Sequence, residues 1–290
     1  MNPVVKSAKE IVLKEIKYLS GFYPHNLKRY LSPAMIYASS IVAFMDPISE
    51  FPHDFQKRLI NLFAGIELLA AGVNLHSFNI EDFVMLTSDV NPGVKKINKV
   101  RSEKNYTVDL LFGDVFYSRA VIYILRYDDF NIFSSILQSL KSAHKSKLFL
   151  HQKIVDTLNK NRDRLKNLDK KIKGKNNYEK HVLDLLEENE VFLPGVNSLL
   201  KTSFFLGWGI FLPDTNQKLP YELINDFVLL KTFSDLKDFL SGLPQYFNFL
   251  RNISYIEQKK QEIKNRINDA VLQLKPNWFG RNIKSLERIY

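Results

Sequence analysis

Apolar side chains recur at helical spacing along residues 54–82, and they cover far more than one narrow stripe of the expected helix. They include Leu59, Ile60, Leu62, Phe63, Ile66, Leu69, Ala70 and Val73. A helix at a protein surface needs one apolar stripe, whereas a helix that is apolar nearly all round is buried. This segment therefore predicts a central helix that other helices surround.

The same periodicity recurs along most of the chain, and no alternation typical of strands persists. Helices are expected at residues 4–19, 33–44, 54–82, 105–127, 130–158, 178–190, 196–212, 221–240 and 255–274. Asn91-Pro92-Gly93 predicts a loop over 87–93, and Asp128-Asp129 predicts a helix boundary. Only 11 Gly and 11 Pro occur in 290 residues, fewer turn residues than a multi-stranded fold needs. We therefore expect an all-α fold, a single bundle of nine or ten helices over residues 1–290.

Composition excludes several other classes of protein. Hydrophobic residues make up 45% of the chain, so a core can form and disorder is not expected. The absence of cysteine excludes disulfide-stapled modules and cysteine-based metal sites. Residues 1–20 mix charged with single apolar residues, unlike a signal peptide, and the apolar run 204–212 is about half the length of a membrane span. We expect a soluble, cytoplasmic protein with at most peripheral membrane contact.

Positive charge is concentrated in one block. The formal net charge is +10, and residues 141–180 contain 13 Lys or Arg against 4 Asp or Glu. Residues 159–177 within this block are polar and predict a solvated helix end followed by a flexible basic loop. The alternative is a patch for nucleic acid or anionic lipid. No aromatic residue lies between Phe149 and Tyr178 to stack on bases, so nucleic acid is not expected as a partner.

Motifs of the common catalytic classes are missing from the chain. It has no GxGxxG, GxxxxGK[ST], HExxH or GxSxG sequence. His144 and His151 lie two helical turns apart, a weak metal signal without a third ligand. Asp235 and Asp238 lie three residues apart, so one helical face could present both to a magnesium ion, although Lys237 lies between them.

Five short stretches are similar, in order along the chain, to motifs of one all-helical enzyme family. They are RYLSP (29–33), ELLAAGVNLHSFNIED (67–82), LLFGDVFYSRA (110–120), LLKTSFF (199–205) and LKTFSDLKDF (230–239). The chain thereby resembles the trans-polyprenyl diphosphate synthases, which elongate isoprenoid diphosphates. The resemblance covers most of the chain and implies the isoprenoid-synthase fold, a helical bundle around a central cavity.

The first aspartate-rich motif of that family is degenerate in this chain. Members of the family hold magnesium ions between two such motifs on facing helices, and the ions take up charge on the leaving diphosphate. The two leading aspartates align with Ser77 and Phe78, the third aligns with Glu81, and Asp82 follows. A phenyl ring cannot ligate magnesium, so this motif has lost part of its metal site.

The second aspartate-rich motif is altered as well. Its first aspartate aligns with Ser234, whereas Asp235 and Asp238 match the pattern. Lys237 adds a positive charge inside the motif, and Lys231 stands where the family has glutamine.

The family's second diphosphate site is also depleted. Its lysine aligns with Arg29, its arginine with Ser32 and its histidine with Ala70. Lys201 matches the lysine of a later motif, so Arg29 and Lys201 are the expected residual diphosphate contacts. The family's double-arginine element has no clean match, although Lys95-Lys96 and Arg101 lie near its place.

The resemblance therefore implies a chain that has kept the scaffold and lost most of the diphosphate chemistry. The run GDVFYSRAVIYIL (113–125), followed by KSKLFLHQK (145–153), is most similar to the non-catalytic small subunit of heteromeric heptaprenyl or hexaprenyl diphosphate synthases. Such a subunit assembles with an aspartate-rich catalytic subunit, which handles the allylic and isopentenyl diphosphates. The resemblance implies a heterodimer, or else a homodimer, with no cofactor in this chain and magnesium on the partner.

Segments 64–75 and 110–125 are apolar beyond one face, which is typical of helices in the core and also of helices at a subunit interface. Gly72 and Val73 stand where the family's tunnel-lining residues set product length, although close helix packing is another explanation. Two other functions remain open. One is an autonomous enzyme with an altered site at Glu81, Asp82, Asp235 and Asp238, and the other is a basic binding module centred on residues 160–175.

Overall fold

The computed structural model describes residues 3–22, 34–43, 52–76, 92–160, 193–211, 221–242 and 254–273. Their elements are α1 (Pro3–Leu19), α2 (Ala34–Ala43), α3 (His53–His76), α5 (Pro92–Ile124), the 3₁₀ turn η3 (Leu125–Tyr127), α6 (Phe130–Lys160), α9 (Leu193–Val196), α10 (Ser198–Phe211), α11 (Tyr221–Gly242) and α12 (Ser254–Gln273). Within these ranges every element is helical and no strand occurs. The all-α prediction is thus confirmed for the described part of the chain.

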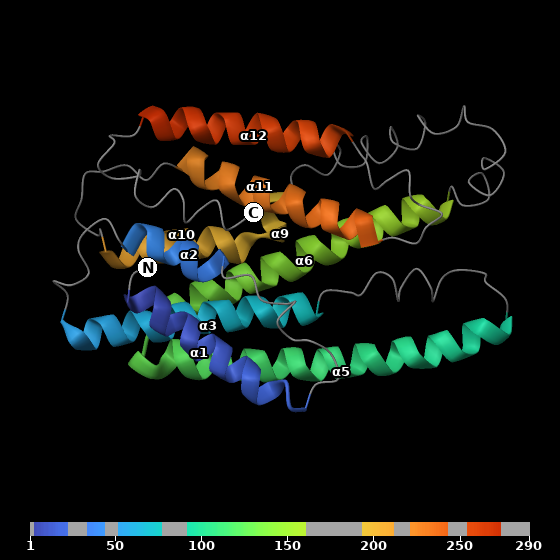
Figure 1. Cartoon of the computed structure of the whole chain (residues 1–290), viewed down its shortest axis with the longest axis horizontal. Helices are drawn as coiled ribbons and strands as arrows, with labels where there is room; N and C mark the ends of the chain where they lie inside the picture. The colour runs from blue at the N-terminus through green and yellow to red at the C-terminus, as the bar shows by residue number, and fades with distance from the viewer. Residues whose placement is uncertain are drawn as a thin grey trace.

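Helix α3 lies in the middle of the bundle (Figure 1). It packs against α5, α1 and α2, and more lightly against α6 and α10, while α12 packs on α11 at the far edge. Every residue of α3 from Asn61 to Val73 is buried. The sequence prediction of a central, surrounded helix is therefore confirmed, and the apolar surface of α3 is covered by this chain's own helices.

Two glycines let α3 and α5 approach closely along an antiparallel contact. A Cβ atom on Gly65 would lie 2.6 Å from Cγ1 of Ile124 and 3.1 Å from the carbonyl oxygen of Ala120. A Cβ atom on Gly72 would lie 2.6 Å from the ring of Tyr117 and 3.1 Å from the carbonyl oxygen of Gly113. Glycine suits both positions because a Cβ atom would overlap the Ile124 or Tyr117 side chain and would crowd a carbonyl oxygen of α5.

The boundary predicted at Asp128-Asp129 is confirmed. Helix α5 tightens into η3, Asp128 adopts a left-handed conformation with φ of 57°, and α6 begins at Phe130. Aspartate tolerates this conformation better than most residues. The buried Asp129 accepts hydrogen bonds from both Nε and Nη2 of Arg58, the former at 2.9 Å, which ties the turn to the start of α3.

Helix α5 begins earlier than the sequence predicted. Pro92 and Gly93 were expected in a loop, but both belong to the first turn of α5. Proline suits this position because the first helical residues have no intrahelical acceptor for their N–H groups.

Helix α6 extends two residues beyond its predicted end at residue 158, through Asn159 and Lys160. The remaining segment 161–177, the helix predicted at 178–190 and the end of the helix predicted at 54–82 lie outside the described residues.

Among the described residues, His53–His76 is the one helix long and apolar enough by composition to cross a membrane. Of its most apolar window, 78% is buried inside the protein. Burial of this kind is also what the core helix of a compact bundle requires.

Candidate functional site

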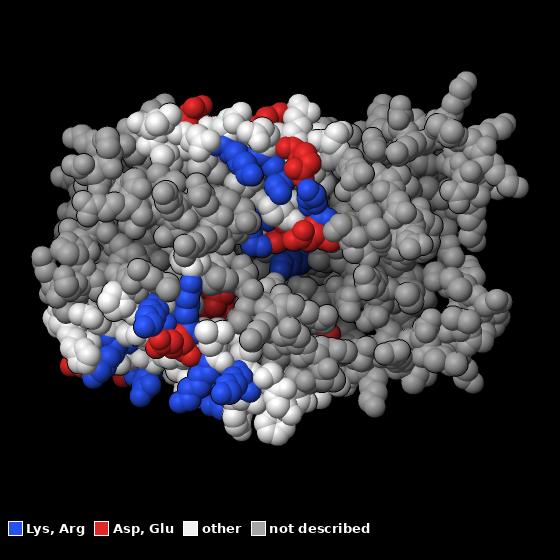
Figure 2. Space-filling view, in the orientation of Figure 1, with Lys and Arg blue, Asp and Glu red and all other residues white. Residues whose placement is uncertain are grey.

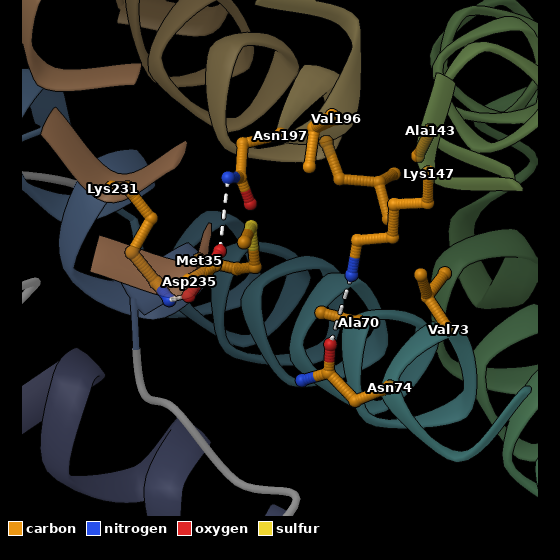
Figure 3. Close-up of a pocket in the computed structure, with 11 residues that line it drawn as sticks. Met35, Ala70, Val73, Asn74, Ala143, Lys147, Val196, Asn197, Lys231 and Asp235 are labelled. Carbon is orange, nitrogen blue, oxygen red and sulfur yellow. Dashed lines mark hydrogen bonds and ion pairs between the residues drawn. The ribbon is translucent and has the colours of Figure 1, made fainter. Parts of the chain in front are cut away.

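A small pocket with both apolar and polar lining residues lies against α3 (Figure 3). Its apolar lining residues are Met35, Ala70, Val73, Ala143, Val196 and Leu199. Its polar lining residues are Asn74, Lys147, Asn197, Lys231 and Asp235. These side chains come from α2, α3, α6, α11 and the α9–α10 corner, so the tertiary fold alone brings them together. In Figure 2, Lys and Arg side chains lie among Asp and Glu side chains around a hollow near the middle of the drawn face.

One wall of the pocket is an ion pair within α11. Nζ of Lys231 donates to Oδ1 of Asp235 one turn later, and the two side chains are 17% and 31% exposed. Nδ2 of Asn197 donates to the other oxygen, Oδ2, at 3.0 Å. Both oxygens of Asp235 therefore already accept hydrogen bonds from this chain.

Asn197 itself is held firmly at the corner between α9 and α10. Its Nδ2 also lies 3.0 Å from Oγ1 of Thr232, which donates to the carbonyl oxygen of Val228 at 2.8 Å. Its backbone carbonyl accepts hydrogen bonds from the N–H groups of Leu200 and Lys201. The amide that faces Asp235 is thus fixed by the fold.

The opposite wall carries Lys147, which reaches into the pocket from α6 (Figure 3). Its Nζ donates to Oδ1 of Asn74 on α3 at 3.3 Å. Burial lowers the pKa of Lys147 from its ordinary value, the charge of Asp235 opposes that shift, and the charge of Lys231 adds to it. The two lysines and the aspartate therefore interact electrostatically across the pocket.

A buried acid, Glu67, lies behind the α2 wall. Its side chain is 2% exposed, and its Oε2 accepts hydrogen bonds from the N–H groups of Met35 and Ile36, both at 3.1 Å. These N–H groups belong to the first turn of α2, which has no intrahelical acceptors for them. Burial raises the pKa of Glu67 to about 8, although the two hydrogen bonds, Lys9 and Lys231 each favour the ionised form. The neutral acid therefore predominates at pH 7.

A histidine–tyrosine cluster lies at the end of α3. Tyr117 Oη lies 2.6 Å from Nε2 of His144, and the rings of Tyr117 and His76 meet edge to face. Nε2 of His76 lies 3.0 Å from the carbonyl oxygen of Leu110. Burial raises the pKa of Tyr117, and burial with the charges of His76 and Lys147 lowers that of His144. Tyr117 therefore stays protonated and can donate to a neutral His144.

The residues that align with the family's second aspartate-rich motif lie in different surroundings in the structure. Asp235 lines the pocket, whereas Ser234 donates to the carbonyl oxygen of Leu230 within α11 at 3.0 Å. Nζ of Lys237 reaches α12 and pairs with Glu257 at 2.7 Å, and Asp238 is exposed. The predicted shared face of Asp235 and Asp238 is thus divided between pocket and surface.

The other predicted positions divide similarly. Val73 lines the pocket, as does Ala70, while Gly72 lies at the close contact with α5. Lys201 lies on α10 with its Nζ 5.9 Å from the ring centre of Phe205. Six other predicted residues lie outside the described residues, namely Arg29, Ser32, Ser77, Phe78, Glu81 and Asp82. For four more, the structure describes the helical backbone and not the side chain, namely Lys95, Lys96, Arg101 and His151.

Lys147, Asn74, Asn197 and Glu67 were not predicted as site residues. Lys147 lies in the basic block 141–180, N-terminal to the part interpreted as solvated, and it follows Ala143 by four residues and precedes Leu150 by three. Both neighbours are buried. That spacing places a lysine on an apolar helical face, and this was the signal available in the sequence.

No protein-family model, curated protein or solved structure matches this chain. Among the described residues, no group of three or more His, Asp or Glu is arranged to hold a metal ion. The pocket and the sequence resemblance are therefore the features of this chain that bear on its function.

Proposed function

We propose that this chain is the non-catalytic subunit of a heteromeric long-chain trans-polyprenyl diphosphate synthase. It would assemble with an aspartate-rich catalytic subunit and help to set the length of the product. The observation that carries this proposal is the state of Asp235. This residue matches a metal-binding aspartate of the family pattern, yet its carboxylate accepts hydrogen bonds from Lys231 and Asn197 of the same chain.

The chemistry of that arrangement disfavours magnesium. The ion prefers several hard oxygen ligands in octahedral geometry, and each carboxylate must be available to it. An ammonium group next to the carboxylate both occupies an oxygen and repels a divalent cation. Lys231 stands where the family has glutamine, so the pair is a property of this chain and supports a role without metal chemistry.

The exposed face of α5 supports assembly with a partner. Leu111, Val115 and Ile122 lie on one face of the helix and are 59%, 38% and 59% exposed. The opposite face, with Phe116 and Ile124, is buried against α3. Exposed apolar residues that share one face of a helix are typical of interfaces more than of free surfaces. We infer that the catalytic subunit packs on this stripe.

Co-expression with the aspartate-rich synthase of the same organism tests the proposal. We expect the two chains to co-purify, and the complex to make a product of different length from that of the synthase alone. Replacing Leu111 and Ile122 by Lys should abolish co-purification, because two charges would be desolvated at the interface. Leu272→Lys on α12 is the matched control, since Leu272 is 81% exposed elsewhere.

Two results would reject the proposal. One is that adding this chain changes neither the length of the synthase's product nor the synthase's elution volume in size-exclusion chromatography. The other is magnesium-dependent turnover of allylic and isopentenyl diphosphates by this chain alone, which would support an autonomous enzyme.

A further inference from the structure

The pocket described above has more cationic than anionic side chains. Lys147 on α6 and Lys231 on α11 line it, together with the single carboxylate of Asp235. Glu67 interacts electrostatically with Lys231, but it is largely neutral at pH 7 because burial raises its pKa to about 8. By formal charge, the described lining of the pocket is therefore more positive than negative.

Its size restricts what can enter. The cavity volume is about 40 Å³. A buried water needs roughly 10–15 Å³ of such space, so three or so waters would fill the pocket. Pockets for drug-sized ligands are about 300–1,000 Å³, and a prenyl chain is therefore too large. A single tetrahedral oxyanion displaces about as many waters as this pocket can hold.

Its lining supplies hydrogen-bond donors of the right chemistry. An ammonium group has three N–H donors; Lys231 gives one to Asp235, and Lys147 gives one to Asn74. The side-chain N–H groups of Asn197 already donate to Thr232 and Asp235, so the two lysines are the cationic donors that line the pocket. Met35, Val196 and Leu199 form apolar walls, and a drier site strengthens each ionic contact.

We propose that this pocket binds one phosphate-class oxyanion without a metal ion, held between Lys147 and Lys231. The two ammonium groups take the place that divalent cations occupy in metal-dependent phosphate sites, and Asp235 holds Lys231 in position while the pocket is empty. The inference rests on the proposed function only for the source of the anion. That source is either free inorganic phosphate or the terminal phosphate of a larger ligand.

Titration of the full chain with inorganic phosphate in the presence of EDTA tests the site. Calorimetry and phosphorus NMR measure the binding. We expect saturable binding with one site per chain. Lys147→Met and Lys231→Met should each weaken it at least tenfold, because each removes a charge-assisted contact. The matched controls are Lys141→Met on α6 and Lys237→Met on α11, both exposed lysines, which should change affinity less than twofold.

Asp235→Asn gives a change of opposite sign. It removes the one carboxylate of the pocket and nearly keeps its shape, so phosphate should bind several-fold more tightly. Lys147→Arg retains the charge and should bind within a few-fold of the natural chain. This variant keeps the test decisive if a methionine variant fails to fold, which thermal unfolding would reveal.

The source of the anion is distinguished with methyl phosphate. Equal binding of methyl phosphate supports a terminal phosphate group, and binding of inorganic phosphate alone supports the free ion. The proposal is overturned if the natural chain does not bind phosphate saturably, or if the pocket and control variants bind equally. If the chain binds phosphate but does not co-purify with a synthase, the proposed subunit role is rejected and the proposed phosphate site is still supported.

Discussion

On the side of α3 that faces α5, Gly65 and Gly72 bring two helix backbones into close contact, and no space remains for even one added carbon. On the side that faces α6 and α11, Ala70 and Asn74 border a pocket that contains two lysines and an aspartate. The first side is apolar and close-packed, and the second has unfilled volume and partly buried charge. We infer that the first side contributes mainly to stability, whereas the second contains the candidate functional site.

The physical difference is one of sensitivity. Close-packed contacts respond to side-chain volume, because neighbouring atoms have nowhere to move. Buried ionisable groups respond to pH and to the loss of a partner, because desolvation makes each charge dependent on its surroundings. Substitutions on the two sides of α3 should therefore differ in kind: pH should change the effect on the polar side and leave the effect on the close-packed side unchanged.

The largest effect should come from Glu67 and should depend on pH. Its pKa is about 8 in the folded chain against 4.5 for the ordinary group. As pH rises from 4.5 to 8, the unfolded chain releases this proton first, so folding stability falls over that window. Each pKa unit corresponds to about 1.4 kcal/mol, and the loss should reach a few kcal/mol.

Denaturant unfolding of Glu67→Gln across this pH range measures the effect. The amide keeps an oxygen acceptor for the first turn of α2 but cannot ionise, so its stability should not fall with the same slope. Glu10→Gln, at an exposed position of α1, should keep the slope of the natural chain. Parallel curves for the natural chain and Glu67→Gln would show that Glu67 does not titrate in this window.

On the close-packed side, Gly72→Val should destabilise the chain by about 2–3 kcal/mol, independently of pH. The first added carbon already meets the Tyr117 ring at 2.6 Å. Gly21→Val is the control, because a Cβ there would lie 3.6 Å from the nearest atom, the carbonyl oxygen of Tyr18. Urea unfolding of both variants compares them, and equal stabilities would mean that the α3–α5 contact can expand.

The two sides were not equally predictable from the sequence. The central position of α3 follows from apolar residues on nearly every face, and the expected helices at 4–19 and 221–240 agree closely with α1 and α11. Helix position depends on local periodicity, which a single sequence contains. The start of α5 was missed because proline and glycine also occur in the first turn of a helix.

The pocket was harder to predict, because it depends on contacts between distant segments. Lys147 and Asn74 are 73 residues apart, and Asn197 and Asp235 are 38 apart. Lys147 belongs to a basic block, and most lysines in such a block are solvated. The family resemblance predicts Asp235 as a site residue, but only the fold places Lys231, Asn197 and Lys147 around it.

The smallest loss of stability should come from breaking the Lys231–Asp235 ion pair of the pocket. Its size and salt dependence should differ from those of an ordinary surface pair. Lys231→Met should destabilise the chain by about 1 kcal/mol, because Asp235 would keep Asn197 and the more distant Lys147 as compensation. Lys237→Met breaks a pair with Glu257 whose side chains are 46% and 54% exposed, so its effect should stay within about 0.5 kcal/mol. Added salt should reduce the second effect more than the first, since partly buried pairs are screened less. Urea unfolding of both variants at low and high salt makes the comparison. Equal losses of stability with equal salt dependence would show that Lys231–Asp235 behaves as an ordinary surface pair. The polar side of α3 would then lack the partly buried charge expected of a functional site.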